Sequence, residues 1–167
     1  MEILWSPWRS QYIDSFKEES KIDEPSCFIC DAVNAIGEEK KRLVIARLDF
    51  SIVMLNKFPY NNGHILIAPK KHTGDIDELN DVEAAEMLST VRRASSILKK
   101  VFNPNGFNIG MNLGRVAGAG LPCHIHIHIV PRWNGDANFM PVIADTKVIS
   151  QSLEQTQEIL AKEFNCF

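Results

Sequence analysis

The sequence lacks a long apolar run. No stretch of its 167 residues approaches the roughly 20 apolar residues that a membrane-spanning helix needs. Residues 1–8 also lack the basic segment followed by an apolar run that marks a secretory signal. We therefore expect a cytoplasmic protein that does not enter the membrane.

An excess of positive charge is missing as well. Lysine and arginine number 18 against 21 aspartate and glutamate residues, which gives a formal net charge of −3 at pH 7. Nucleic acids are bound mainly through many contacts between basic side chains and phosphates. The balance therefore argues against a nucleic-acid polymer as partner and favours a small substrate.

Proline and glycine are sparse, with 8 and 9 residues, and 45% of the chain is hydrophobic. This composition suffices for one buried core, so we expect residues 26–167 to form a single domain. Residues 1–25 are polar and irregular, and we expect an N-terminal arm that becomes ordered by docking its large side chains. These side chains are Trp5, Trp8, Tyr12, Ile13 and Phe16.

Three strand patterns follow one another in the first half of the chain. Apolar and β-branched runs occupy residues 43–46, 51–55 and 64–68, and residues 59–63 have the composition of a turn. We expect three consecutive antiparallel strands.

A helix pattern comes next. It begins with a capping pattern at Asn80 and places apolar residues at three- and four-residue steps as far as Val101. Residues 106–113 and 123–130 predict two more strands, and residues 149–163 predict a final helix. The order predicts an α+β fold in which an antiparallel sheet of about five strands is flanked by helices.

Three of the five histidines stand at alternate positions, as His124, His126 and His128. In a strand they share one face, and the intervening isoleucines share the other. This pattern leaves three interpretations open: a solvated face, a metal site with an open position for water, or a nucleophilic imidazole that attacks phosphorus. In the third, the glycine-rich loop at residues 114–120 supplies backbone donors to the phosphate.

A close pair of cysteines stands near the amino terminus, Cys27 and Cys30. This spacing serves zinc ligation and thiol redox chemistry equally well. The βαβ pattern that usually accompanies a redox pair is missing from the sequence around it.

Residues 123–132 resemble the signature of the histidine triad (HIT) family, in which histidines alternate with apolar residues. Residues 55–69 resemble the family's nucleotide-binding hairpin, and residues 111–114 resemble its phosphate-side strand end. Residues 4–9 and 132–139 are similar to the branch that includes diadenosine tetraphosphate phosphorylases and hydrolases. The resemblance implies a HIT-like fold and a homodimer.

The resemblance also implies an activity, namely a nucleotidyl hydrolase or transferase that cleaves a nucleoside 5′-phosphoryl linkage. The substrate is then a dinucleoside polyphosphate or a nucleoside phosphoramidate. His126 is expected to attack the α-phosphate and become a nucleotidyl-histidine. His128 is expected to contact the phosphate and assist the leaving group.

Further positions match family residues that bind the nucleotide. Asn56 matches a ribose ligand, and Asn112 matches a phosphate ligand. Gly118 lies in the glycine-rich loop, and we expect either backbone N–H groups of this loop or Arg115 to contact the phosphate. Arg115 is equally well interpreted as a solvated loop residue. His64 matches a supporting position beside the histidine run, where a structural role is the simpler interpretation.

Branches of the family hold a structural zinc ion, and the resemblance assigns its ligands here to four residues. The other interpretation is that these four side chains bind no metal. Separately, a divalent cation could accompany the substrate. The expected ligands are Cys27, Cys30, His72 and His124.

Two rival functions remain open. The chain could be a non-catalytic nucleotide-binding or interaction module, although mere binding would not require His126. It could also be a metallohydrolase that uses the histidines as metal ligands.

Overall fold

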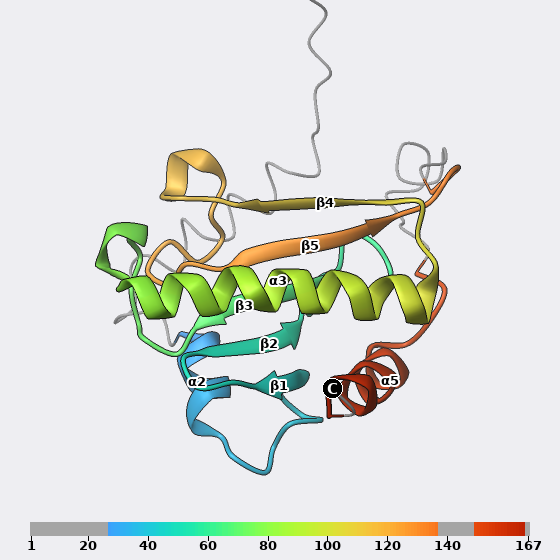
Figure 1. The fold of residues 1–167 in the computed structure, drawn as a ribbon, viewed down its shortest axis with the longest axis horizontal. Helices are drawn as coiled ribbons and strands as arrows, with labels where there is room; N and C mark the ends of the chain where they lie inside the picture. Colours follow the sequence, from blue (N-terminus) through green and yellow to red (C-terminus); the bar gives the residue numbers. More distant parts are fainter. Residues whose placement is uncertain (1–26, 137–148, 166–167) are drawn as a thin grey trace, which may run out of the picture.

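The computed structural model describes residues 27–136 and 149–165. Five strands form one sheet in the order β1-β2-β3-β5-β4, and every neighbouring pair is antiparallel (Figure 1). The predicted α+β fold with about five strands is therefore confirmed. The strands are β1 (Val44–Arg47), β2 (Ser51–Leu55), β3 (Ile65–Pro69), β4 (Gly106–Met111) and β5 (Ile127–Arg132).

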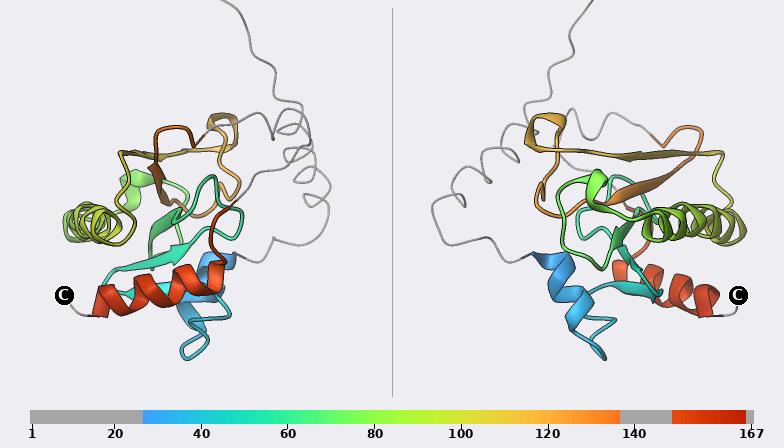
Figure 2. Two further views of the ribbon diagram at one scale, coloured as in Figure 1. Left: turned by 90° about the vertical axis from the view of Figure 1, so that its right-hand side faces the viewer. Right: turned by 60° about the vertical axis from the view of Figure 1, so that its left-hand side comes forward.

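Helices lie on both faces of the sheet. The long helix α3 covers one face, and the short helix α2 lies on the other (Figure 2). The strands alternate accordingly: Val53 and Leu55 of β2 pack in the core with α3, whereas Ile52 and Met54 pack with α2. The helices are α2 (Phe28–Asn34), α3 (Asp81–Phe102) and α5 (Leu153–Asn165), with short 3₁₀ turns η1 (Ile76–Glu78) and η2 (Arg115–Ala117).

The predicted start of α3 is confirmed by its hydrogen bonds. The Asn80 side chain accepts the N–H groups of Val82 and Glu83, and the Glu83 carboxylate accepts the N–H of Asn80 at 2.9 Å. This capping box satisfies N–H groups that the first turn leaves without helical partners.

The final helix, α5, covers the outer edge of β1. Gln157 donates from Nε2 to the carbonyl oxygen of Val44 at 2.6 Å, while Leu160 and Phe164 are buried in the core shared with α3. At the other edge of the sheet, three of the six residues of β4 are exposed and the other three are half-buried. The β1 edge is therefore covered by a helix, whereas no described element pairs with the outer edge of β4.

The largest difference from the predicted strand boundaries is at β5, while the strand expected at residues 106–113 ends at Met111. The strand expected at residues 123–130 begins only at Ile127. Before it, the N–H of Ile125 donates to the carbonyl of Thr73 at 2.7 Å and not to β3. The loop after β3 and the segment before β5 approach each other closely here, since a Cβ atom added to Gly74 would lie 2.5 Å from the carbonyl oxygen of Pro122.

The expected N-terminal arm at residues 1–25 lies outside the described residues. The single domain at residues 26–167 stays a prediction. Within residues 27–136 and 149–165, no helix combines the length and apolar character needed to cross a bilayer.

Candidate active site

The three histidines come together, although they do not share a strand. His128 lies in β5 opposite Leu66, which places it on the face of the sheet that α2 covers. His124 and His126 lie in the segment before β5, and both are buried. The ring centroids of His126 and His128 are 4.8 Å apart.

The His126 ring has one nitrogen fixed by the backbone. Its Nδ1 lies 2.8 Å from the carbonyl oxygen of His124, and a carbonyl can only accept, so Nδ1 carries the proton. Burial, through loss of solvation, lowers the pKa of His126 below its ordinary value, which favours the neutral ring. A neutral ring with Nδ1–H has its lone pair on Nε2, the form in which imidazole is a nucleophile.

The opposite tautomer is fixed in His128. The backbone N–H of Tyr60 donates to Nδ1 of the buried His64 at 3.0 Å, so the proton of His64 lies on Nε2. That Nε2 lies 2.9 Å from Nδ1 of His128, which must therefore accept. A neutral His128 then presents Nε2–H as a donor. His126 thus presents a lone pair on Nε2, and the neighbouring His128 presents a proton on Nε2.

Burial, and then the charge of His126, lower the pKa of His128 from 6.5 to about 4. In the unfolded chain His128 takes up a proton as the pH falls below 6.5, whereas in the folded chain it does so only near pH 4. The free energy of unfolding is therefore expected to fall as the pH is lowered from 6.5 to 4. His128→Asn is expected to make this pH dependence shallower, by an amount that corresponds to at most one proton taken up on unfolding. Urea unfolding of both proteins at several pH values measures the difference. Equal slopes would contradict this prediction.

A second cluster lies next to the first. Nδ1 of His124 is 3.2 Å from Sγ of Cys27 and 3.5 Å from Sγ of Cys30, and Nδ1 of His72 is 3.1 Å from Sγ of Cys30. All four donor atoms lie within 4.8 Å of one another. A tetrahedral zinc site separates its donor atoms by roughly 3.3–3.8 Å.

The chemistry of the four donors also fits a cation. His124 donates from Nε2 to the carbonyl of Pro69 at 2.8 Å, so its lone pair lies on Nδ1 and faces the two sulfur atoms. Burial, with the neighbouring Cys27 thiol, raises the pKa of Cys30 to about 11. A bound divalent cation reverses that preference because it stabilises the thiolate. The residues present therefore fit a zinc ion.

The predicted nucleotide ligands make different local contacts. Asn56 directly follows β2, and its Oδ1 accepts the N–H of Phe58 at 2.9 Å, so it caps the turn. Asn112 donates from Nδ2 to the carbonyl of Gly118 at 3.2 Å. The N–H of Gly118 donates to the carbonyl of Arg115 within the loop, so its predicted phosphate contact would require the loop to rearrange.

The expected role of His126 as a nucleophile implies that a backbone carbonyl fixes its other nitrogen, but sequence patterns do not identify which backbone groups orient the histidines. These are the carbonyls of Pro69 and His124 and the N–H of Tyr60. All three are backbone groups, so no residue type signals them.

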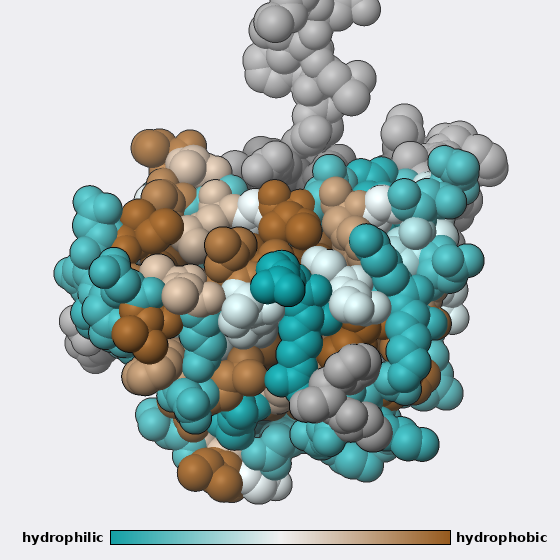
Figure 3. All heavy atoms as spheres, in the orientation of Figure 1, coloured by the Kyte–Doolittle hydropathy of each residue, from teal (hydrophilic) through white to brown (hydrophobic). Residues whose placement is uncertain are grey.

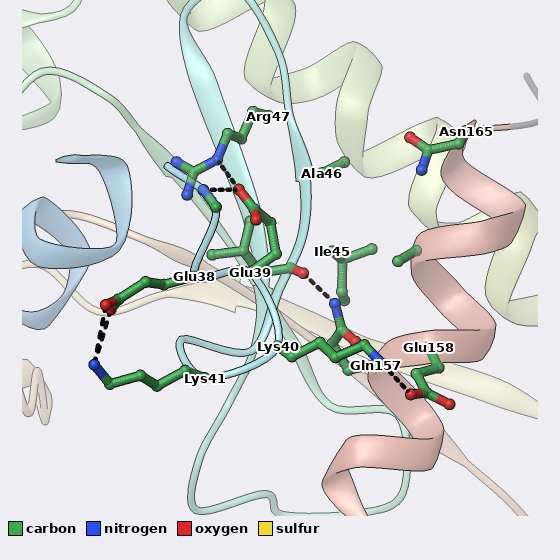
Figure 4. Close-up of a pocket in the computed structure, with 13 residues that line it drawn as sticks. Glu38, Glu39, Lys40, Lys41, Ile45, Ala46, Arg47, Gln157, Glu158 and Asn165 are labelled. Carbon is green, nitrogen blue, oxygen red and sulfur yellow. Dashed lines mark hydrogen bonds and ion pairs between the residues drawn. The ribbon is translucent and has the colours of Figure 1, made fainter. Parts of the chain in front are cut away.

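A groove of about 910 Å³ between α5 and the segment before β1 lies apart from these clusters (Figure 4). Its basic side chains are each paired with a carboxylate, as in Lys40 with Glu158, Lys41 with Glu38, and Arg47 with Glu39. A phosphate would have to displace these carboxylates. The groove is therefore a poor candidate for the nucleotide site.

The fold and the site define a class of protein. An antiparallel α+β sheet presents one buried histidine with a free Nε2, a second with a free N–H, and a four-residue metal-type cluster beside them. Such an arrangement is suited to transfer of a phosphoryl-linked group through a histidine.

Comparison with known proteins agrees with this class. The HIT domain model matches residues 37–135. The AP-4-A phosphorylase of Mycobacterium tuberculosis is 36% identical over 98% of this chain and 85% of its own length. The asymmetrical bis(5′-nucleosyl)-tetraphosphatase of Schizosaccharomyces pombe is 29% identical over 71% of this chain and 61% of its own. The chain belongs to the histidine triad (HIT) family.

A solved structure gives the same result for the fold. The Zn-bound histidine triad family protein from Mycobacterium smegmatis superposes with a TM-score of 0.66 and 25% sequence identity, covering 84% of this chain and 94% of that one. The expected HIT-like fold is confirmed.

Proposed function

We propose that this protein cleaves the 5′-phosphoryl linkage of a dinucleoside polyphosphate such as diadenosine tetraphosphate through a nucleotidyl-histidine on His126. The prediction of a HIT-type nucleotide-processing enzyme is confirmed by the family match and by relatives named as a phosphorylase, a tetraphosphatase and an adenosine 5′-monophosphoramidase. The observation that carries the intermediate is the free Nε2 of His126.

The proposed reaction has two steps. Nε2 of His126 attacks the α-phosphorus, an N–P bond forms, and the bond from phosphorus to the bridging oxygen breaks. The leaving oxygen receives a hydrogen bond from Nε2–H of His128. The His124 carbonyl stabilises the positive charge that the adduct places on the His126 ring. Water or phosphate then attacks phosphorus and releases the nucleotide from His126.

Two amides complete the proposed nucleotide site. Asn56 binds the ribose hydroxyls, for which an amide offers both a donor and an acceptor. Asn112 contacts the phosphate from the end of β4 and also shapes the glycine-rich loop. Gly118 contacts the phosphate only after the loop rearranges.

We also propose that Cys27, Cys30, His72 and His124 hold a structural zinc ion. Bound zinc would join α2 to the loop after β3 and to the segment before β5. The ring of His124 would bind the zinc, and the backbone carbonyl of His124 accepts the N–H of the His126 ring. The zinc site is therefore linked to the nucleophile by a single residue.

The substrate and the acceptor are tested by product analysis. Diadenosine tetraphosphate is incubated with and without inorganic phosphate, and the nucleotides are separated by ion-exchange chromatography. Cleavage by water gives AMP and ATP, whereas cleavage by phosphate gives ADP and ATP. Absence of both product pairs, with a nucleoside phosphoramidate also uncleaved, would favour a non-catalytic nucleotide-binding module.

The rival metallohydrolase is less well supported by the geometry. The Nδ1 atoms of His126 and His128 are occupied by the His124 carbonyl and by His64, and His126 is not part of the metal-type cluster. Cleavage that persists in His126→Asn but stops on chelation would instead favour this rival.

We propose that the homodimer forms through β4 and the adjacent part of α3. Apolar residues are visible over the upper part of the face shown in Figure 3. The exposed apolar residues of these elements include Ile109 of β4 at 49% and Leu88 of α3 at 65%. No other described strand pairs with the outer edge of β4. An exposed edge strand readily pairs with another chain.

The dimer surface is tested with Ile109→Lys, which places a charge on the proposed face. Light scattering after size exclusion is expected to give twice the 18.8 kDa of one chain for the wild type and a single chain's mass for the variant. Ile36→Lys is the control, because Ile36 is 83% exposed and lies outside this face. A wild-type monomer would contradict the proposal.

A further inference from the structure

A hydrogen-bond network at the end of β5 has no part in the chemistry proposed above. The Asp136 carboxylate accepts from Nε and Nη2 of Arg132 at 2.6 and 2.8 Å, and from the backbone N–H of Trp133 at 3.1 Å. Its Oδ2 also accepts the side-chain N–H of Asn61 at 2.8 Å. The Asp136 side chain is only 9% exposed. It therefore ties the turn after β5 to the loop before β3.

Asn61 makes a second bond to the same region. Its Nδ2 donates to the carbonyl of Pro131 at 3.1 Å, and the residue is buried. Because both partners of Nδ2 are acceptors, the amide can have only one orientation here. Residue 61 is thereby fixed to the end of the strand that carries His128.

The position of residue 61 controls the surroundings of His64. The Asn61 carbonyl accepts the backbone N–H of His64 at 3.2 Å. The preceding residue, Tyr60, donates its N–H to Nδ1 of His64 at 3.0 Å. If residue 61 were free to move, both bonds would lose their geometry, and the proton of His64 would no longer be held on Nε2.

We propose that Asn61 and Asp136 are positioning residues, which clamp the loop at residues 56–63 to β5 so that His64 holds His128 in its Nε2-protonated tautomer. Neither side chain touches the substrate in this proposal. Its catalytic consequence rests on the proposed function, because only there does Nε2–H of His128 contact the leaving oxygen. The tautomer itself is a property of the protein without substrate.

Nitrogen NMR of the imidazole rings tests the clamp in protein labelled with ¹⁵N-histidine. In the wild type, His128 is expected to be protonated on Nε2 and His126 on Nδ1. In Asn61→Ala and Asp136→Asn, His128 is expected to become a mixture of tautomers. His126 is expected to stay unchanged, because its partner is the His124 carbonyl, and it is the internal control. Turnover of diadenosine tetraphosphate is expected to fall about tenfold or more.

A matched control is Asn134→Ala on the same turn, where the side chain is exposed and only the backbone N–H is bonded, to Asn105. It is expected to leave both tautomers as in the wild type. If Asn61→Ala does not fold, Asp136→Asn decides alone. An unchanged His128 tautomer in the folded variants would overturn the proposal. Failure of the wild type to cleave any substrate would overturn the proposed function and leave the NMR result to decide on the clamp.

Discussion

Replacing His126 with glycine is expected to remove the nucleotidyl-histidine and to lower turnover of diadenosine tetraphosphate by about 10⁴-fold or more. The reason is that His126 combines burial beside His128 with a lone pair on Nε2. Intact-mass spectrometry after brief mixing, under conditions that preserve acid-labile phosphoramidates, is expected to show one added nucleotidyl group on the wild type only.

The same experiment separates the nucleophile from its neighbour. His128→Asn keeps Nε2 of His126 and is expected to slow turnover while the adduct can still form. Both variants are expected to keep the zinc content of the wild type, because neither removes a proposed ligand. An adduct on His126→Gly would show that another residue is the nucleophile.

Removing one proposed zinc ligand is expected to have the largest effect on stability. Cys30→Ser takes a thiolate from the cluster and is expected to lower the zinc content from about one ion per chain. At free zinc a thousandfold above the dissociation constant, bound metal stabilises the folded state by about 4 kcal/mol. For a chain of this size that loss lowers Tm by roughly 8–16 °C.

Cys123→Ser is the matched control, because Cys123 is a cysteine outside the four-residue set. It is expected to keep the zinc and to change Tm little. Metal content is measured by inductively coupled plasma mass spectrometry, and Tm by calorimetry. A wild type purified with zinc available that contains none, or a Cys30→Ser protein with unchanged zinc and Tm, would contradict the proposed site.

Local patterns were sufficient for most of the fold. The strands expected at residues 43–46 and 64–68 lie one residue further along, at Val44–Arg47 and Ile65–Pro69, and the strand at 51–55 has its expected bounds. The cap at Asn80 places the start of α3 correctly. Alternation and capping are set by neighbours in the sequence, so they can be recognised without the fold.

Contacts between distant segments account for the differences. Helix α2 has only seven residues, too few for a clear periodic signal, and its N-cap is the proposed zinc ligand Cys27. The late start of β5 depends on Thr73, which pairs with Ile125 from a distant part of the chain.

The residue types of the candidate site could also be predicted from the sequence, whereas the proton positions on its rings could not. The alternating histidines and the cysteine pair mark both clusters in the sequence. Which nitrogen of each ring carries the proton depends on backbone atoms of residues 60, 69 and 124, and these positions become known only once the chain is folded.

The unequal edges of the sheet limit how many chains can assemble. With α5 across β1 and its Gln157 bonded to Val44, β4 is the edge that the described part of the chain leaves open to a further strand. If two copies pair by that edge around a twofold axis, as proposed, each one uses the β4 edge, and the described strands offer no open edge to a third copy. The proposed pairing would therefore close at two chains and would not grow into a fibre by strand addition.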